Sequence, residues 1–460
     1  MSDGTQVKRR PVAAGPSGGV RRLLASVLDR DVLQLVRGSG FIFACRVSGA
    51  VLALLTQWVL ARWLGAEDLG SYLLAYSWMI LVARLTGLGY NSSAVRFIGA
   101  GLAHDDRSTI RGFVRFTTRT VYTVSIAAAV LGAAGSYLLV GRSGGDPWPM
   151  VIAFAAVPIV AGCGNLFGFA ASYSWFGAAF VPNTVLRPSL FLGSVCMIWW
   201  LGASIGVSGV MLLQVGSMAV ALITLVWVVG RPLRRDLVGA SPRFERWLWT
   251  HTSLSLLIIS LFRDYLPELS IIVAGVYLTS EEIAIFTIGY RIAALISFVL
   301  FAVDSFTLPQ ISQAAALDDR EQLLKFSVRA TRLTFLASLG ALLGFWLFGR
   351  FVLGLFGEEF VEGYTLLLII AVAQVLRASV GPVLPLLMVG GHERESLKVY
   401  GVSLLIVAPV VMVLAPAWGV VGVGIAVASV IVLSSLALHH RVRHLMGFSP
   451  SILSSLSRST

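Results

Sequence analysis

Long apolar segments separated by short polar loops make up most of this chain. A helix needs about 20 residues, at about 1.5 Å each, to cross a hydrocarbon core of about 30 Å. About twelve segments meet that length, and they are expected near 38–61, 70–90, 117–140, 149–171, 185–202, 207–230, 247–276, 283–309, 331–349, 363–390, 399–415 and 419–438. The alternation of apolar and polar residues that marks the strands of a membrane barrel is absent from the sequence. The pattern therefore predicts an all-α, polytopic membrane protein.

Composition supports the same fold class. Of the 460 residues, 57% are hydrophobic and 13% are charged, and the mean hydropathy is +0.84, whereas soluble domains carry about 25% charged residues. A net charge of +12 is compatible with nucleic-acid binding, but the arginines lie mostly in short loops on one side of the predicted spans, so no nucleic-acid partner is expected. The three cysteines fall within apolar segments without metal-ligand spacing, so no metal or cofactor is expected either.

Alternate loops along the chain are basic. The basic side includes an arginine-rich tail over 1–37 and a linker over 231–246, and the other side carries acids such as Glu67 and Glu359. Cytoplasmic loops are enriched in Lys and Arg, so both termini are predicted to lie in the cytoplasm. We expect 1–37 to be a disordered cytoplasmic tail, compatible with attraction to anionic membrane lipids.

Three short motifs recur in the same order in the two halves of the sequence. The pairs are Glu67-Asp68 with Glu281-Glu282, Asp105-Asp106-Arg107 with Asp318-Asp319-Arg320, and Arg115-Phe116 with Lys325-Phe326. An even number of spans per half gives both halves the same orientation. We therefore predict two six-helix bundles related by a pseudo-two-fold axis along the membrane normal, with a substrate site between them. The predicted divisions are a basic tail over 1–37, a bundle over 38–230, a basic linker over 231–246, a bundle over 247–440 and a cytoplasmic tail over 441–460.

Charged residues inside the predicted spans are the candidate functional residues. Each costs about 2.5–3.5 kcal/mol at a bilayer centre on insertion scales, and such residues usually serve function. The set comprises the arginines Arg46, Arg84, Arg263, Arg291 and Arg377 and the acids Asp264, Glu268 and Asp304. Most lie in the seventh and eighth spans, which are predicted to line a polar pathway. A structural role stays open for some of them: Glu268 and Arg291 lie at similar depth and suit an ion pair, and Arg46 is near enough to the cytoplasmic end to snorkel.

The excess of arginine over acid indicates the charge of the cargo. A guanidinium stays protonated and matches the geometry of phosphate oxygens, so the arginines are assigned to binding of an anionic substrate. An exporter of organic cations would be expected to place carboxylates there instead. The acids Asp264, Glu268 and Asp304 are candidates for coupling to an ion. Pro267 cannot donate a backbone hydrogen bond to Arg263, so the seventh helix is expected to be interrupted.

With these residues in view, the chain resembles the multidrug/oligosaccharidyl-lipid/polysaccharide exporter superfamily, and within it the polysaccharide-transporter branch, whose members flip O-antigen or capsule repeat units. The resemblance covers about 38–440 and is carried by the stretch Ala61-Arg62-Trp63-Leu64-Gly65-Ala66-Glu67-Asp68-Leu69-Gly70-Ser71-Tyr72, by Arg187-Pro188, and by Asp264, Tyr290-Arg291 and Pro309-Gln310-Ile311-Ser312 in the seventh and eighth spans. It implies two bundles around a V-shaped cavity that alternates between the leaflets.

The resemblance also implies a function. It implies a flippase for a polyprenyl-pyrophosphate-linked oligosaccharide in the bacterial cytoplasmic membrane, serving lipopolysaccharide or exopolysaccharide biosynthesis. A monomer is expected, driven by an ion gradient or the membrane potential, with a polysaccharide polymerase and glycosyltransferases as possible partners. The sugars of the cargo and the coupling ion stay open.

Two other functions remain as alternatives. A membrane glycosyltransferase or polysaccharide polymerase would use the same lipid-linked sugars, but such enzymes generally need a sizeable outer domain, and the outer loops here are short. A drug or cation exporter of the same superfamily is the second. A flippase for the peptidoglycan precursor fits less well, because the resemblance implies fourteen spans for that branch and twelve are expected here. The sequence contains no phosphate-cradling loop, zinc-protease motif or nucleophile elbow, so no catalytic residue is assigned and no enzyme is expected.

Overall fold

The computed structural model describes residues 30–142, 144–317 and 319–451. The chain divides into two units, Met1–Ala44 and Cys45–Thr460. Of the first unit the structure describes only the start of a helix, from Arg30, so most of the tail predicted over 1–37 lies outside the described residues. The end of the tail predicted over 441–460 also lies outside them. All regular structure in the described part is helical, in agreement with the predicted fold class.

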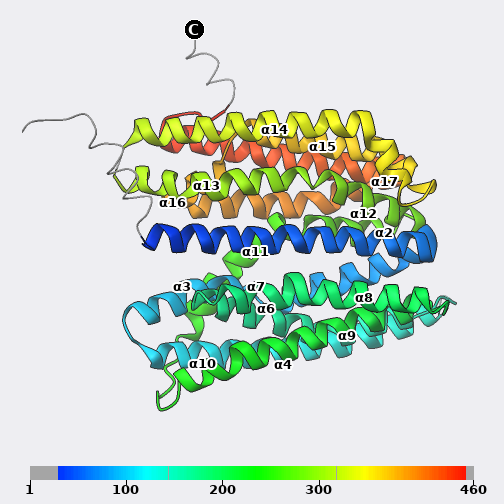
Figure 1. Cartoon of the computed structure of the whole chain (residues 1–460), viewed down its shortest axis with the longest axis horizontal. Coiled ribbons are helices and arrows are strands. Elements are labelled where there is room, and N and C mark those ends of the chain that lie inside the picture. Colours follow the sequence, from blue (N-terminus) through cyan, green and yellow to red (C-terminus); the bar gives the residue numbers. More distant parts are fainter. Residues whose placement is uncertain (1–29, 143, 318, 452–460) are drawn as a thin grey trace, which may run out of the picture. The chain divides into compact units, whose positions relative to one another are not determined.

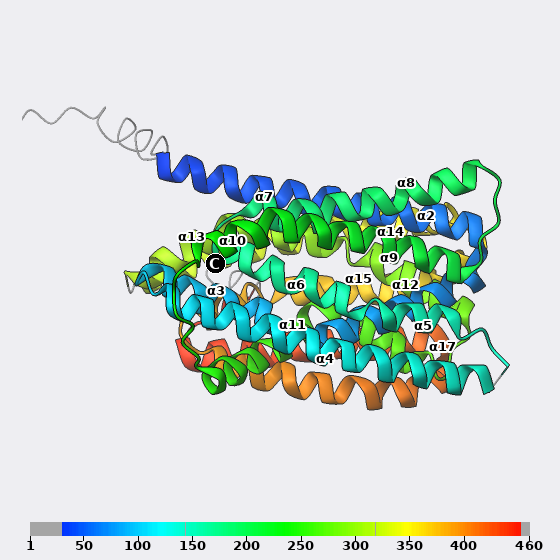
Figure 2. The same ribbon diagram turned by 90° about the horizontal axis from the view of Figure 1, so that it is seen from below.

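The first half of the chain runs from α2 to α10 (Figure 1). Its helices are α2 (Arg30–Thr86), α3 (Tyr90–Ala103), α4 (Arg107–Arg142), α5 (Trp148–Ala155), α6 (Val157–Ser172), α7 (Phe176–Phe180), a π-helical turn (Val181–Leu186), α8 (Arg187–Trp200), α9 (Val207–Leu225), a second π-helical turn (Val226–Gly230) and α10 (Arg231–Asp236). In Figure 2, α4, α6, α8 and α9 run along a common direction, as expected of packed membrane helices.

The second half runs from α11 to α17. Its helices are α11 (Arg246–Ala274), α12 (Ser280–Ala293), α13 (Ile296–Ala316), α14 (Arg320–Gly354), a 3-10 turn (Glu359–Gly363), α15 (Tyr364–Ser379), α16 (Val383–Val389) and α17 (Glu393–Met446). The tenth span is broken between α15 and α16, where Gly381 adopts φ +85° just before Pro382. A left-handed φ of this kind costs glycine little and other residues more.

Two helices each contain two membrane spans. Helices α2 and α17 have 57 and 54 residues, far more than the about 20 that a bilayer needs. The backbone leaves the helical region at Gly65 (φ 77°, ψ 175°) and at Gly419 (φ 54°, ψ −135°). Within the described residues nine helical segments are long and apolar enough to cross a membrane. Counting α2 and α17 as two spans each, and adding the charged α11, gives the predicted twelve.

Helix α11 differs from its prediction. Pro267 lies inside an unbroken helix from Arg246 to Ala274, so the expected interruption of the seventh span was wrong. Proline removes one backbone donor, but packing against neighbouring helices tolerates it in membrane helices. The break instead falls in the eighth span, at Ala294–Leu295 between α12 and α13, three residues after Arg291.

The repeated aspartates mark equivalent helix starts. Asp106 precedes α4, and its carboxylate accepts hydrogen bonds from Thr109 N at 3.0 Å and Thr109 Oγ1 at 2.7 Å. Asp319 precedes α14, and its carboxylate accepts from Gln322 N at 3.0 Å and Gln322 Nε2 at 2.7 Å. These are N-caps on helices of 36 and 35 residues, each the third span of its half. Asp318, the other member of the repeat, lies outside the described residues.

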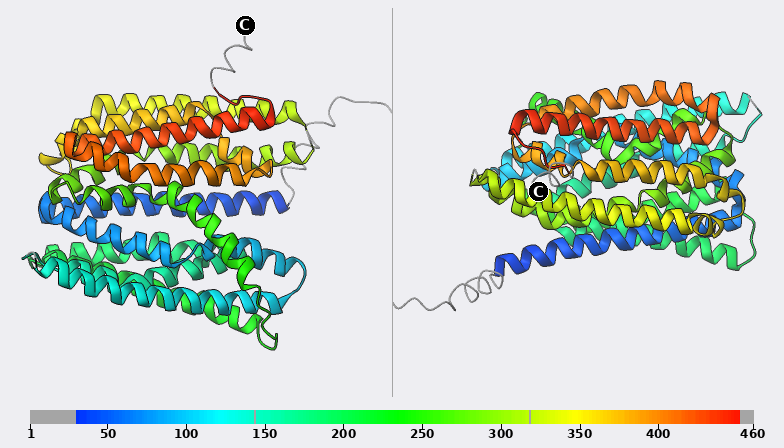
Figure 3. Two further views of the ribbon diagram at one scale, coloured as in Figure 1. Left: turned by 180° about the vertical axis from the view of Figure 1, so that it is seen from behind. Right: turned by 90° about the horizontal axis from the view of Figure 1, so that it is seen from above.

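The buried core follows the two halves. One cluster of buried apolar residues comes only from 259–442 and a smaller one only from 83–161. A third joins both halves and includes Leu69 and Tyr72 with Ile285 and Phe360. Within Cys45–Thr460 the helices of the two halves form two groups, and α11 slants between them (Figure 3, left). This is the predicted arrangement of two helical bundles.

The two halves meet at the end of the bundles that carries Gly65 and Thr279, called here the Gly65 end. Arg62 donates from Nε to Leu355 O at 2.8 Å, and Trp58 donates from Nε1 to the same carbonyl at 2.9 Å. Ser71 Oγ donates to Ser280 Oγ at 3.0 Å. The absence of a side chain at Gly70 permits this approach, because a Cβ there would collide with the Ser280 carbonyl.

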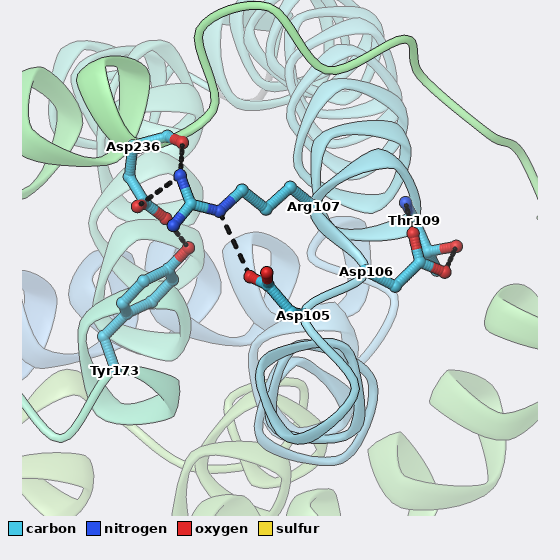
Figure 4. A network of polar contacts seen from close by, with 6 residues as sticks. All are labelled: Asp105, Asp106, Arg107, Thr109, Tyr173 and Asp236. Atoms are coloured by element: carbon cyan, nitrogen blue, oxygen red, sulfur yellow. Dashed lines mark hydrogen bonds and ion pairs between the residues drawn. The ribbon is translucent and has the colours of Figure 1, made fainter.

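At the opposite end, called the linker end, the linker is attached to the first half. Arg107 Nη1 donates to Asp236 O at 3.1 Å and lies 3.5 Å from its carboxylate, and Tyr173 donates to the same carboxylate at 2.8 Å (Figure 4). Burial and this hydrogen bond raise the pKa of Tyr173. Arg243 N donates to Ser108 O at 3.1 Å. These bonds therefore attach the linker to the start of α4.

Helix α11 changes partners along its length. Near its start, Trp249 packs on Phe113 at 5.3 Å between ring centroids, and Ser253 Oγ lies 2.6 Å from Ser93 Oγ. Further along, Phe262 stacks on Tyr400 of α17 at 4.6 Å. The first part of α11 thus packs on the first half of the chain and the remainder on the second, so α11 connects the two bundles mechanically.

Candidate functional site

The charged residues predicted from the sequence lie in one connected set of helices. Arg84 lies over the ring of Tyr265, and three further pairs interact electrostatically without a direct bond: Arg46 with Asp264, Glu268 with Arg291, and Asp304 with Arg377. Two of these four interactions join the first half of the chain to α11, and the other two lie within the second half. Helix α11 is therefore the element around which the charges gather.

Arg263 and Asp264 neutralise each other. Arg263 Nε donates to Asp264 Oδ1 at 2.9 Å and Nη2 donates to Oδ2 at 3.0 Å. Both side chains are partly open, with 48% and 39% of their surfaces exposed. A bidentate pair of this kind is the strong form of a charge-assisted hydrogen bond. Asp264 is therefore not a free carboxylate in this conformation, and any role in ion coupling requires the pair to open.

The two arginines of the first half contact aromatic rings. The guanidinium carbon of Arg46 lies 4.4 Å from the Phe301 centroid, and that of Arg84 lies 5.2 Å from the Tyr265 centroid. A guanidinium over an aromatic face is stabilised by the ring quadrupole without losing its charge. Arg84 Nε is buried and finds no hydrogen-bond partner among the described residues. Arg84 therefore keeps a donor available for a ligand.

One polar cavity lies within the second half and is called the Arg377 cavity. Its volume is about 240 Å³. The polar residues of its lining are Arg263, Asp264, Tyr290, Ser297, Gln374, Arg377, Tyr400, Ser434 and Ser435. Gln374 is 2% exposed, and its Oε1 has no hydrogen-bond partner among the described residues. Because Arg263 is paired with Asp264, Arg377 contributes the net positive charge of this lining, and Asp304 acts on it electrostatically.

The second cavity lies between the two halves and is called the Arg187–Arg291 cavity. Its volume is about 70 Å³. It is lined by Ala53, Thr56, Gln57, Leu60, Tyr72, Leu73, Tyr76, Arg187, Pro188, Phe191 and Gln214 from the first half and by Arg291 from the second. With its amide oxygen turned toward α12, Gln57 accepts hydrogen bonds from Nε and Nη1 of Arg291. The lining contains two arginines and no carboxylate.

The ion pair considered between Glu268 and Arg291 is not formed among the described residues. Glu268 acts on Arg291 electrostatically, but Gln57 supplies the hydrogen bonds. Glu268 Oε2 is buried and has no hydrogen-bond partner in the described part of the chain. An unsatisfied buried carboxylate oxygen is costly.

Several polar residues that line the cavities were not predicted from the sequence as site residues. Arg187 stood out only as part of an Arg-Pro motif at the start of a span, and Gln57, Tyr72 and Gln214 had no charge to draw attention. Tyr72 and Gln214 are each 4% exposed, and Tyr72 donates to Gln214 Oε1 at 3.2 Å. A glutamine in the middle of an apolar span is the signal that could have found Gln57 and Gln214. The described residues form no group of three or more potential metal ligands.

Comparison with known proteins identifies the family. Residues 35–315 match the family model described as polysaccharide biosynthesis protein. The chain belongs to this family. It is also 22% identical over 415 residues to a protein named probable low-salt glycan biosynthesis flippase Agl15 of Haloferax volcanii, a match that covers 86% of this chain and 81% of that protein.

The fold of this family member is shared with several solved transporters. An inward-facing multidrug resistance MATE family transporter of the MOP superfamily superposes with a TM-score of 0.69 at 19% identity, covering 86% of this chain and 96% of that one. The lipid II flippase MurJ in an inward closed conformation gives 0.69 at 11% identity, covering 88% and 87%. A MOP superfamily transporter from Pyrococcus furiosus gives 0.60 at 18% identity, covering 89% and 94%. The resemblance predicted from the sequence is confirmed by the family model, and the fold agrees with that of these transporters.

Proposed function

We propose that this protein is a flippase that moves a polyprenyl-pyrophosphate-linked oligosaccharide across the cytoplasmic membrane by alternating access. The observation that carries the proposal is the surplus of guanidinium groups over carboxylates at two cavities among the membrane helices. Family membership and the likeness to a glycan biosynthesis flippase support a lipid-linked glycan as the cargo.

The chemistry of the lining favours an anionic cargo over a cationic one. Arg377 lines one cavity and Arg187 and Arg291 line the other, and the one carboxylate in either lining, Asp264, is already paired with Arg263. A diphosphate needs donors that stay charged in a low-dielectric site, and guanidinium groups meet that need. Arg46, Arg84, Arg263, Arg291 and Arg377 are therefore proposed as substrate-binding residues. The surplus of guanidinium groups in these linings would repel the cargo of a drug or cation exporter.

The contacts between the halves suit alternating access. The hydrogen bonds of Arg62 and Ser71 join the two halves at the Gly65 end. They are few, so rocking of one bundle against the other can break and reform them, while Tyr90 and Ser93 keep the start of α11 attached to the first half. We place the linker end in the cytoplasm, together with both termini, because its loops are basic.

Energy for transport is proposed to come from an ion gradient or the membrane potential. Glu268, with an unsatisfied buried oxygen, and Asp304, which acts on Arg377, are the candidates that can exchange a proton or cation without first breaking an ion pair. Asp264 joins them if its pair with Arg263 opens. Moving one charge through the membrane potential supplies about 2.3 kcal/mol per 100 mV.

The organisation and partners follow from the same proposal. The proposed bundles are 38–230 and 247–440, joined by the linker 231–246, and the protein is proposed to act as a monomer. A glycosyltransferase would supply the lipid-linked unit, and a polysaccharide polymerase would use it on the other face of the membrane. No covalent step is assigned to this chain.

The test is to analyse lipid-linked glycans in a strain that lacks the protein. A flippase leaves its cargo unaltered, so loss of the protein should strand complete repeat units facing the cytoplasm. A polymerase defect would strand single units facing outward, and a glycosyltransferase defect would leave units short of a sugar. Complete units accessible from outside would refute the proposal. So would purified protein in liposomes that moves no labelled polyprenyl-pyrophosphate glycan under any imposed gradient while a related flippase succeeds.

A further inference from the structure

The Arg187–Arg291 cavity places two like charges from opposite halves against one buried hydroxyl. Tyr72 interacts electrostatically with both Arg187 and Arg291. Its hydroxyl is fixed because it donates to Gln214, and Gln57 fixes the guanidinium of Arg291. The side chains around the cavity are therefore held in place before any ligand arrives, which lowers the entropic cost of binding.

No acid neutralises these two arginines directly. Among the described residues neither Arg187 nor Arg291 forms an ion pair, and Glu268 acts electrostatically on Arg291 from outside the lining. Two cations that face one cavity in a low-dielectric region repel each other. An anion between them is attracted by both guanidinium groups and offsets their repulsion, so the charges of this site favour binding of an anion.

The size of the cavity limits the ligand. A water molecule needs about 10–15 Å³ of such space, so a cavity of about 70 Å³ holds a few waters or one group of similar size. A phosphoryl group fits this space and offers oxygens that guanidinium donors match, whereas a sugar ring does not fit. The Arg377 cavity, with about 240 Å³ and its own carboxylate, differs in both size and charge.

We propose that the Arg187–Arg291 cavity binds one phosphoryl-sized anion, and that this anion holds the Gly65 end closed. Arg187 belongs to the first half and Arg291 to the second, so both can contact one anion only while the halves are together. A ligand that binds one state better shifts the population toward that state. The anion is either free phosphate or a phosphoryl group of the lipid-linked cargo, and only the second case rests on the proposed function.

The test uses the contact between Ser71 and Ser280 as a reporter of closure. Their hydroxyl oxygens lie 3.0 Å apart, so cysteines at both positions, with the three native cysteines replaced by alanine, should form a disulfide when the Gly65 end is closed. In purified full-length protein, inorganic phosphate should raise the rate of disulfide formation in a saturable manner. The variant Arg187→Gln should require about tenfold more phosphate or fail to respond, because a hydrogen bond to a charged group is lost.

Control variants separate this site from the rest of the surface. Arg350 is exposed and lies over the Tyr364 ring, 5.0 Å from its centroid, outside both cavities, and Arg350→Gln should respond to phosphate as the parent does. If Arg187→Gln does not fold, Arg187→Lys keeps the charge, loses the planar fork, and should show a weaker response.

Polyprenyl pyrophosphate without sugar distinguishes the two sources of the anion. A response to phosphate that depends on Arg187 supports a free anion, and a response to the lipid alone that depends on Arg187 supports the cargo. No response to either probe, or a response in Arg187→Gln and Arg187→Lys equal to that of the parent, would overturn the proposal. Transport in liposomes is measured separately without phosphate, so failure of the anion site and failure of the flippase function give different results.

Discussion

The arginines among the membrane helices differ in the kind of group that each one contacts. Arg263 has a carboxylate, Arg46 and Arg84 have aromatic rings, and Arg291 has the neutral amide of Gln57. Only the first of these partners removes the charge. The other arginines keep their positive charge among the membrane helices, where a charge usually serves a function, and we propose that this function is binding of the anionic cargo.

Arg377 tests this view directly. Its charge dominates the Arg377 cavity, so Arg377→Glu should abolish transport at normal protein levels, because it repels the anionic cargo. Arg377→Lys keeps the charge but loses the fork, and a lost charge-assisted hydrogen bond of about 1.5–3 kcal/mol should lower activity by about tenfold or more. Complementation of a deletion strain, with protein levels checked by immunoblot, measures both. Full export by the Glu variant would remove Arg377 from the site.

The pair of Arg263 and Asp264 allows a coupling role to be separated from a structural one. If Asp264 exchanges an ion, Asp264→Asn should slow transport and alter its dependence on the imposed gradient, and adding Arg263→Gln should not restore it. If the pair is only structural, the double variant should recover much of the loss, since no charge is left unpaired. Initial transport rates in liposomes at several gradients distinguish the two. Unchanged gradient dependence in Asp264→Asn would exclude coupling.

At the scale of elements, helix ends carry the internal repeat. Asp106 and Asp319 cap the third span of each half with the same set of bonds, from the backbone N–H three residues on and from that residue's side chain. These hydrogen bonds hold the pKa of each aspartate below its usual value, and the bond from the backbone N–H has the largest effect. The sequence repeat is therefore a structural signal for a helix start rather than a mark of the substrate site.

The caps have a consequence for stability. A carboxyl group with a depressed pKa contributes stability that is present above its unfolded-state pKa and is lost as pH falls through its folded-state pKa. We expect Asp106→Ala and Asp319→Ala to lower the melting temperature at neutral pH, while Asp→Asn at either site retains most of the cap. The difference between parent and Ala variants should shrink in acid. Thermal unfolding of detergent-purified protein across pH measures this, and an undiminished difference below the folded-state pKa would contradict it.

The whole molecule depends on how two bundles are joined. The Gly65 end is closed by contacts between the halves, and the linker end is held by the linker and by the start of α11. Helix α11 packs on the first half near Trp249 and on the second near Phe262. We therefore expect α11 to bend between these positions when the bundles move.

Orientation in the membrane is the prediction at this scale. In a cysteine-free background, single cysteines at Gly144 and Glu359 should react with an impermeant thiol reagent in intact cells, because the loops that contain them lie on the less basic side. A cysteine at Arg235, in the basic linker, should react only after the cells are permeabilised. The reversed labelling pattern would place both termini outside.

Much of this architecture can be predicted from the sequence, because it depends on the length and hydropathy of successive segments. Bilayer thickness sets the length of each span, so the twelve spans and the two halves follow from apolar runs and the repeat around Asp106 and Asp319. The cost of a charge in hydrocarbon singles out Arg84, Arg291 and Arg377 without any structure. The break at Gly381-Pro382 also follows from local backbone chemistry.

The partners of those charges were decided only by the tertiary structure. Gln57 lies far along the chain from Arg291, and Tyr265 from Arg84, so each pairing depends on how the helices are rotated and packed. Arg187 lines a cavity only because helix packing brings it to the same cavity as Arg291 of the second half. Pro267 stays within an unbroken helix because neighbouring helices support it. Local sequence fixes which groups are costly in the membrane, whereas contacts between distant helices decide which of them remain free to bind.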